Sequence, residues 1–215
     1  MIIISLNTDK LQEDGAITLE LSDGSSLLLS LYYLPDSLMQ TFTGTETGGE
    51  EPTIGESEIS PDDEAAFRFA ALCYRAEKTA LRLVARAEQN SLGLAAKLER
   101  RGYTSGVAKA VVARLLNRNL LDDSRYAELW VRSRLTLKKA PSPNWLLASL
   151  VKRGIDKDTA RKTLAKVLDP EAEYALLLRY LEKTRIPDAE KVRYLRAQLK
   201  YEGFSFDALE LYFKN

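Results

Sequence analysis

The stretch LLDDSRYAELWVRSRL, residues 120–135, decides how the rest of the chain is interpreted. Two apolar residues precede two adjacent carboxylates, Asp122 and Asp123, and a segment with helical spacing of apolar residues follows. With Asp122 as the N-cap, Leu121 and Tyr126 fall at the two positions of a hydrophobic staple. Both carboxylates also complement the positive end of a helix. The stretch therefore predicts a helix start rather than a catalytic pair of carboxylates, which would have to converge across a cleft.

Three segments share one pattern of leucines around a glycine. They read LAAKLERRGYTS at 94–105, LLASLVKRGIDK at 146–157 and LRAQLKYEGFSF at 195–206. Leucines lie eight and four residues before each glycine, an apolar residue follows it, and Thr, Asp or Ser comes next. Glycine readily takes the left-handed conformation that ends a helix, and the polar residue caps the next helix. The glycines are 52 and 49 residues apart, which predicts tandem units of three helices, with first helices near 63–89, 122–138 and 170–184.

The chain before the repeats has a different character. Apolar and polar residues alternate on both sides of Asp23-Gly24, which predicts a β-hairpin, and a short strand is expected over 2–6. The region from Thr41 to Glu64 is rich in Gly, Thr and Glu and predicts a flexible acidic linker. We therefore expect a mainly α fold, in which three tandem three-helix repeats form an elongated curved body behind a small N-terminal β-hairpin. The expected boundaries are 1–40 for the hairpin region, 41–62 for the linker, and 63–121, 122–169 and 170–215 for the three repeats.

The net charge of zero hides a division along the chain. Residues 1–67 contain one basic and 14 acidic residues, whereas residues 68–168 contain 22 basic and 8 acidic ones. Such an asymmetry indicates an electrostatic partner for the basic part. A solvated basic helical surface would have the same composition and remains the alternative.

Eleven basic residues of the helical part are candidate contacts to such a partner. Lys78, Arg82 and Arg86 recur every four residues, and Arg134 and Lys138 form another like-charged pair, so each set repels itself unless an anion lies nearby. The dibasic pairs before the first two motif glycines are explained equally well as cations at a helix C-terminus. The full set is Lys78, Arg82, Arg86, Arg100, Arg101, Arg125, Arg132, Arg134, Lys138, Lys152 and Arg153.

Catalytic chemistry has little support in the sequence. The chain has no histidine and one cysteine, Cys73, and it lacks the glycine-rich patterns that bind phosphate. We expect no enzymatic activity and neither a metal nor another cofactor. Cys73 is expected to be a buried small apolar residue, and Trp130 a core residue, with a contact to a partner as the alternative for Trp130. No apolar run approaches the ~18 residues of a membrane span and no signal peptide is evident, so we expect a cytoplasmic protein without membrane association.

The motif at 120–134 resembles a known family. LLDDSRYAELWVRSR is similar to the (L/I)-(L/I)-D-D-x-R-(F/Y)-A motif of the RecX regulators of the RecA recombinase, in which a helix ending in arginine follows. The glycine turns and ALRLVARAEQNS at 80–91 resemble that family as well, so the resemblance covers about 64–215. The chain departs from the family pattern at Gly93, usually an acidic residue, at 140–145, where APSPNW replaces Gly-Pro-x-x-(I/L), and in its long acidic linker.

The resemblance implies a function. It implies a monomeric, non-enzymatic regulator that binds RecA, lodges in the groove of the RecA–ssDNA filament, and usually limits filament growth, strand exchange and ATP hydrolysis. Arg125, Arg132 and Arg134 match the family motif, and the setting would be DNA repair, homologous recombination and the SOS response. Weak direct DNA binding is also expected. The residues alone leave two alternatives: a basic helical module that binds DNA without RecA, and a scaffold for an unrelated acidic protein.

Overall fold

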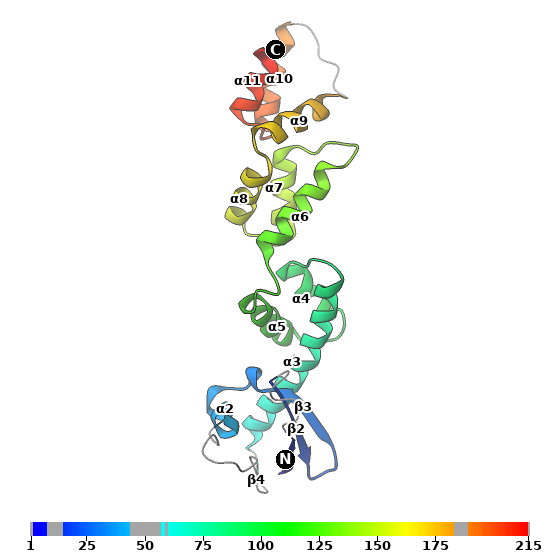
Figure 1. Cartoon of the computed structure of the whole chain (residues 1–215), viewed down its shortest axis with the longest axis vertical. Helices are drawn as coiled ribbons and strands as arrows, with labels where there is room; N and C mark the ends of the chain where they lie inside the picture. The colour runs from blue at the N-terminus through cyan, green and yellow to red at the C-terminus, as the bar shows by residue number, and fades with distance from the viewer. Residues whose placement is uncertain (1, 8–14, 44–56, 59, 183–188, 215) are drawn as a thin grey trace. The chain divides into compact units, whose positions relative to one another are not determined.

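The computed structural model describes residues 2–7, 15–43, 57–58, 60–182 and 189–214 (Figure 1). The chain forms two compact units. The first comprises Met1–Ala87 and Leu94–Leu120, and the second comprises Glu88–Gly93 and Leu121–Asn215. The strands lie in the first unit, together with most of the first helical triplet, and the other two triplets lie in the second.

A small antiparallel sheet opens the first unit. Its strands are β1 (Ile2–Asn7), β2 (Ala16–Leu21), β3 (Ser26–Ser30) and β4 (Ser57–Glu58), in the order β3-β2-β1-β4. The predicted hairpin is confirmed: Gly24 has φ 79° and donates its N–H to the carbonyl of Leu21, and Asp23 Oδ1 accepts from the Ser25 N–H. The alternating residues Ile17 and Leu19 are buried as the pattern predicts. The short strand expected over 2–6 is also present, as β1.

The region between sheet and helices contains more structure than the composition suggests. A 3₁₀ turn, η1 (Leu31–Tyr33), and a helix, α2 (Asp36–Thr43), follow the hairpin, and β4 pairs with β1. Helix α2 and strand β4 thus occupy parts of the segment expected to be a linker. Residues 44–56 and 59, which make up most of that segment, lie outside the described residues.

Three helices complete the first triplet: α3 (Pro61–Arg86), α4 (Ser91–Glu99) and α5 (Ser105–Asn117). Ser60 caps α3 by accepting from the Asp63 N–H, and Pro61 occupies the first helical position, where a missing N–H costs nothing. Figure 1 shows α3 running along the sheet, and Phe67 of α3 is buried in the same core as the strands.

The second and third triplets repeat this plan. They consist of α6 (Asp123–Leu135), α7 (Pro143–Lys152) and α8 (Lys157–Val167), then α9 (Pro170–Leu181), α10 (Ala189–Tyr201) and α11 (Phe206–Lys214). The mainly α fold of three-helix units behind a small β structure is therefore confirmed. Helix α6 ends at Leu135, three residues before the expected end at 138, and α9 ends at Leu181, three residues before the expected end at 184.

The leucine–glycine pattern has the structural meaning that the sequence predicts. Gly102, Gly154 and Gly203 have φ of 90°, 87° and 92°, and each ends the middle helix of its triplet. The polar residue two positions later caps the following helix in each case. The leucines before the glycines are buried in the cores of the triplets: Leu94, Leu98, Leu146, Leu150, Leu195 and Leu199.

Candidate functional site

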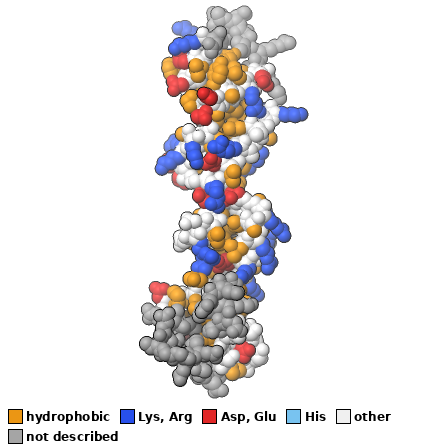
Figure 2. Space-filling model, in the orientation of Figure 1, with side chains coloured by type: hydrophobic (Ala, Val, Ile, Leu, Met, Phe, Trp, Pro, Cys, Tyr) orange, Lys and Arg blue, Asp and Glu red, His pale blue; other side chains and the backbone are white. Residues whose placement is uncertain are grey.

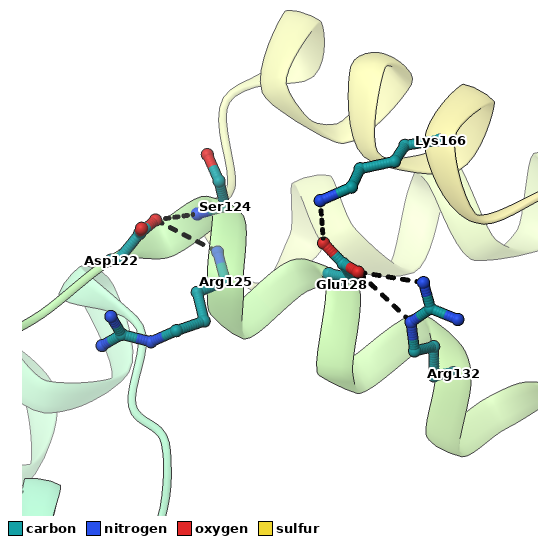
Figure 3. Close-up of polar contacts among 6 residues, drawn as sticks. All are labelled: Asp122, Ser124, Arg125, Glu128, Arg132 and Lys166. Carbon is teal, nitrogen blue, oxygen red and sulfur yellow. Dashed lines mark hydrogen bonds and ion pairs between the residues drawn. The ribbon is translucent and has the colours of Figure 1, made fainter.

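The two aspartates that open α6 serve the starts of two different helices. Asp122 Oδ1 accepts from the N–H groups of Ser124 at 2.8 Å and Arg125 at 3.0 Å, which makes it the N-cap of α6 (Figure 3). The Asp123 carboxylate instead accepts from the Ser91 N–H at 2.7 Å and the Ser91 hydroxyl at 2.8 Å, at the start of α4. Both carboxylates therefore satisfy helix N-termini, and the predicted cap at Asp122 is confirmed.

Two arginines of the family motif form ion pairs within the chain. Arg125 donates to Glu88 at 2.8 Å, and Arg132 donates to Glu128 at 3.0 Å. Figure 3 shows the two guanidinium groups pointing away from one another along α6. The bond to Glu88 raises the pKa of Arg125. Part of the charge of each arginine is thus offset before any partner arrives.

Glu128 is the acidic centre of this surface. It also accepts from Lys166 of α8 at 2.6 Å, so it joins two helices of the second triplet (Figure 3). The hydrogen bond from Lys166, followed by that from Arg132, lowers the pKa of the Glu128 carboxyl. Sequence reasoning identified the Glu128–Arg132 pair from its i,i+4 spacing but missed Lys166, which lies 38 residues away.

The candidate cations of the first unit fall into two kinds. Arg82 and Arg86 are exposed on α3 and have no carboxylate partner among the described residues, whereas Lys78 on the same helix lies 5.3 Å from the ring of Tyr74. Arg100 and Arg101 donate to the carbonyls of Ala96 and Lys97 in the last turn of α4. Arg100 and Arg101 therefore complement the C-terminus of α4, which is one of the two roles that the sequence allows them.

Two further candidate cations of the second unit lie against Trp130. The guanidinium carbons of Arg134 and Arg153 lie 5.0 Å and 4.6 Å from the centroid of its ring. Lys138, in the connection after α6, and Lys152, the last residue of α7, are exposed. None of these four cations has a carboxylate partner among the residues that the structure describes. Figure 2 shows basic side chains on the drawn face of both units, among acidic and apolar ones.

Trp130 is buried, as expected for a core residue, but it has an exposed neighbour that the sequence did not single out. The ring of Trp145 stacks on Trp130 with centroids 6.0 Å apart and an interplanar angle of 23°. Trp145 is 50% exposed, whereas Trp130 is 8% exposed. Trp145 ends the stretch APSPNW, where the chain departs from the family pattern, but nothing in the spacing indicates its contact with Trp130.

A buried ionic cluster in the first unit was also missed. Glu77 of α3 is buried and accepts from the Tyr33 hydroxyl at 2.8 Å, from Arg114 at 3.1 Å and from Arg118 at 3.3 Å. Burial, followed by the bond to Glu77, raises the pKa of Tyr33. The cluster joins η1, α3 and α5, and its charges are satisfied by one another, so we assign it to the fold.

Catalytic and metal chemistry gain no support from these side chains. Within the described ranges, no group of His, Cys, Asp and Glu residues is arranged to hold a metal ion. None of the helices in those ranges combines the length and apolarity that spanning a membrane requires. Cys73 is fully buried on α3, as expected.

Comparisons with known proteins agree with this architecture. Residues 122–164 match the family model described as RecX, second three-helix domain. The regulatory protein RecX of Treponema pallidum (strain Nichols) is 39% identical over 127 residues, which cover 58% of this chain and 77% of that protein. The regulatory protein RecX of Halorhodospira halophila is 32% identical over 133 residues, which cover 60% of this chain and 80% of that protein.

Two solved structures share the fold. A crystal structure of regulatory protein RecX aligns over the whole of both chains with a TM-score of 0.66 and 17% identity. The crystal structure of RecX from Lactobacillus salivarius aligns over 67% of this chain and 96% of its own, with a TM-score of 0.53 and 20% identity. Together with the sequence matches, the helical triplets and the capped Asp-Asp motif show that this chain belongs to the RecX family.

Proposed function

We propose that this chain is a non-enzymatic regulator that binds the RecA recombinase and lodges in the groove of the RecA–DNA filament. There it limits filament growth, strand exchange and ATP hydrolysis, in the setting of DNA repair and homologous recombination. Its relatives are named regulatory proteins, and its own repeated helices offer binding surface without a catalytic constellation among the described residues. We place the protein in the cytoplasm, acting as a monomer.

One observation carries the proposal. Four cations of the second triplet have no carboxylate partner among the described residues, while neighbouring acidic groups are used internally: Arg134, Lys138, Lys152 and Arg153. Of these, Arg153 also donates to the carbonyl of Ser149 at the end of α7. Because the nearby carboxylates are already bonded within the chain, the charge of these cations remains available to an anionic partner. A filament of protein and DNA presents phosphates together with a protein surface, so it is an anionic partner of the kind that these cations can bind.

All eleven candidate cations belong to the proposed site, and we expect them to contribute unequally to binding. The primary contacts are the four cations of the second triplet that have no carboxylate partner among the described residues and the exposed pair Arg82 and Arg86. Lys78 and the ion-paired Arg125 and Arg132 contribute less, because part of their charge is already offset. Arg100 and Arg101 can serve the helix end and a partner together, since each uses only part of its guanidinium group on carbonyls.

The test is RecA-dependent ATP hydrolysis and strand exchange, measured while the protein is added at substoichiometric ratios. The K138E/K152E variant should inhibit less and bind the filament roughly tenfold or more weakly, because like charges now face the phosphates. R161E/K162E is the matched control, since it reverses two exposed cations on α8 of the same unit. Its inhibition should stay close to that of the wild type. No effect of the wild type at any ratio would refute the proposal.

The alternative function is direct DNA binding without RecA. It predicts that the protein shifts duplex DNA in the absence of RecA, with an affinity that falls steeply with the logarithm of salt concentration. The proposed function predicts tighter binding to RecA on single-stranded DNA than to either component alone. A gel shift with duplex and a sedimentation assay with assembled filaments therefore separate the two.

A further inference from the structure

A cleft of about 410 Å³ lies beside the exposed face of Trp145 in the second unit. It is walled by the connection between α6 and α7, the first turn of α7, and residues of α9 and the end of α10. Its lining residues are Leu137, Lys139, Ala140, Pro141, Ser142, Trp145, Tyr180 and Glu202. Its size and its mixture of aromatic, apolar and a few polar groups are those of a small-ligand site.

Trp145 is held rigidly as one wall of this cleft. Ser142 caps α7 by accepting from the Trp145 N–H at 3.3 Å, and the indole stacks on Trp130. Arg134 and Arg153 in turn lie against Trp130. Trp145 lines the cleft and Trp130 does not, so the ring face left open by the stack is available to a ligand. A prepositioned aromatic surface binds with little loss of side-chain freedom.

The other side of the cleft is also fixed. Tyr180 packs against Phe204 with ring centroids 5.4 Å apart. Arg179, its neighbour on α9, donates to the carbonyls of Leu135 and Leu137 and so holds the end of α6 that borders the cleft. Two aromatic side chains, Trp145 of α7 and Tyr180 of α9, therefore line the same cleft.

The charges around the cleft favour a nucleotide over an apolar peptide. Lys139 lines it and Lys138 adjoins it, and neither has a carboxylate partner among the described residues. Glu202 is the acidic lining residue, and a carboxylate can accept from the exocyclic amino group of cytosine or adenine. Aromatic platforms beside cations that track the phosphates are how proteins bind single strands.

A second observation points to an unfilled interaction here. The indole Nε1 of Trp130 and the Nε of Arg134 are buried donors without a hydrogen-bond partner among the described residues. Both groups belong to the cluster around the Trp130 ring, on which Trp145 stacks, and neither residue lines the cleft. Buried donors are satisfied in most native structures, so this cluster has hydrogen-bonding capacity that the described residues do not use.

We propose that this cleft binds one unpaired nucleobase of single-stranded DNA, stacked on Trp145, with the neighbouring phosphate on Lys138 and Lys139. This goes beyond the regulation of RecA and beyond phosphate binding by exposed cations, because it assigns a base-stacking site to one cleft of the second unit. It is tested in the absence of RecA, so its failure leaves the proposed function standing.

The measurement is binding of the full chain to oligo(dC), whose bases carry the exocyclic amino group, monitored by tryptophan fluorescence and by anisotropy of a labelled strand. The chain has two tryptophans, and stacking of a base should quench the exposed one. Trp145→Leu should weaken binding roughly tenfold, the usual loss for one base–aromatic stack. Trp145→Phe should keep most of the affinity while losing the quenching. Tyr194→Leu is the matched control, because Tyr194 is an exposed aromatic of the same unit outside the cleft.

An abasic strand of the same length keeps the phosphates and removes the stacking partner. The wild type should bind it about as weakly as Trp145→Leu binds oligo(dC), and Trp145→Leu should not discriminate between the two strands. This comparison does not depend on any variant folding, since the wild type alone must lose affinity for the abasic strand. Equal binding of both strands by the wild type overturns the proposal. Tighter binding of duplex DNA, or of an RNA strand of the same sequence, than of single-stranded DNA also overturns it.

Discussion

The side-chain amide of Asn144 donates to the backbone carbonyl of Tyr201 at 2.6 Å, and its backbone N–H donates to the carbonyl of Glu202 at 3.0 Å. The first turn of α7 is thereby bonded to the glycine turn that ends α10. Asn90 makes the same kind of bond to the carbonyl of Arg153 beside the preceding glycine turn, at 2.5 Å. The glycine turns therefore serve as docking points for another helix start, besides ending their own helices.

This bond gives Gly203 a second reason to be glycine. At φ 92°, a side chain costs about 1–2 kcal/mol. A Cβ there would also lie 2.5 Å from Asn144 Oδ1 and 3.1 Å from its backbone nitrogen. Gly102 has nearly the same φ, but a Cβ there meets no atom of the described residues within 4 Å. Urea unfolding should therefore show a larger loss of stability for Gly203→Ala than for Gly102→Ala. Equal losses would mean that the contact with Asn144 has no energetic weight.

Glu77→Ala should be among the most destabilising substitutions in the first unit. It leaves the largely buried Arg114 without its carboxylate and the Tyr33 hydroxyl without its acceptor. Removing one partner of a buried pair costs about 3 kcal/mol or more, which chemical denaturation would detect. Glu64→Ala is the control, because the pair of Glu64 with Arg68 lies at the surface, where water screens it, and its loss should cost far less. Similar losses for both variants would contradict the assignment.

The Glu128 carboxyl should make stability depend on acid pH. Its pKa is lowered from the ordinary 4.5 by the bonds from Lys166 and Arg132. A carboxyl group with a lower pKa in the folded state stabilises the fold above its unfolded pKa, and this contribution disappears as the pH falls through the folded value. Glu128→Gln should thus be less stable than the wild type at pH 7, and the difference should shrink below pH 4.5.

The control for this titration is Glu99→Gln. Glu99 is an exposed carboxylate without an ion pair among the described residues. Its substitution should leave the free energy of unfolding at pH 7 close to that of the wild type. A Glu128→Gln curve that runs parallel to the wild type from pH 7 to pH 3 would show that the ion pairs in Figure 3 do not affect folding.

Cys73 should be unreactive in the folded protein. Burial, with a smaller effect of Glu77, raises the pKa of its thiol to about 12, so the thiolate is scarce at pH 8. A thiol reagent should label Cys73 only as fast as the first unit opens, and added urea should accelerate labelling in step with unfolding. Rapid labelling without denaturant would contradict the burial of this side chain.

The sequence predicted what depends on neighbours along the chain. Asp122 as a cap, Gly154 as a helix end and Leu150 as a core residue all follow from spacing within a few residues. These features repeat three times, which made the helical triplets evident.

Pairings across the chain could not be predicted in this way. Asp123 meets Ser91, which lies 32 residues away, and Arg125 meets Glu88, which lies 37 residues away. Helical spacing says nothing about which carboxylate a guanidinium group reaches through space. The sequence therefore identified the basic residues and the local pair of Arg132 with Glu128, but not the partner of Arg125. It also gave no sign that Trp145 stacks on Trp130.

The bonds from Arg179 to the carbonyls of Leu135 and Leu137 mean that neighbouring triplets are not interchangeable modules. A fragment cut after Leu168 would retain α6, α7 and α8 in full, yet the carbonyls at the end of α6 would lose their donor. Transplanting the second triplet into another repeat protein would thus require an arginine at the matching position of the helix that follows it. Without that arginine, the end of α6 would be held less firmly even though every residue of the triplet is present.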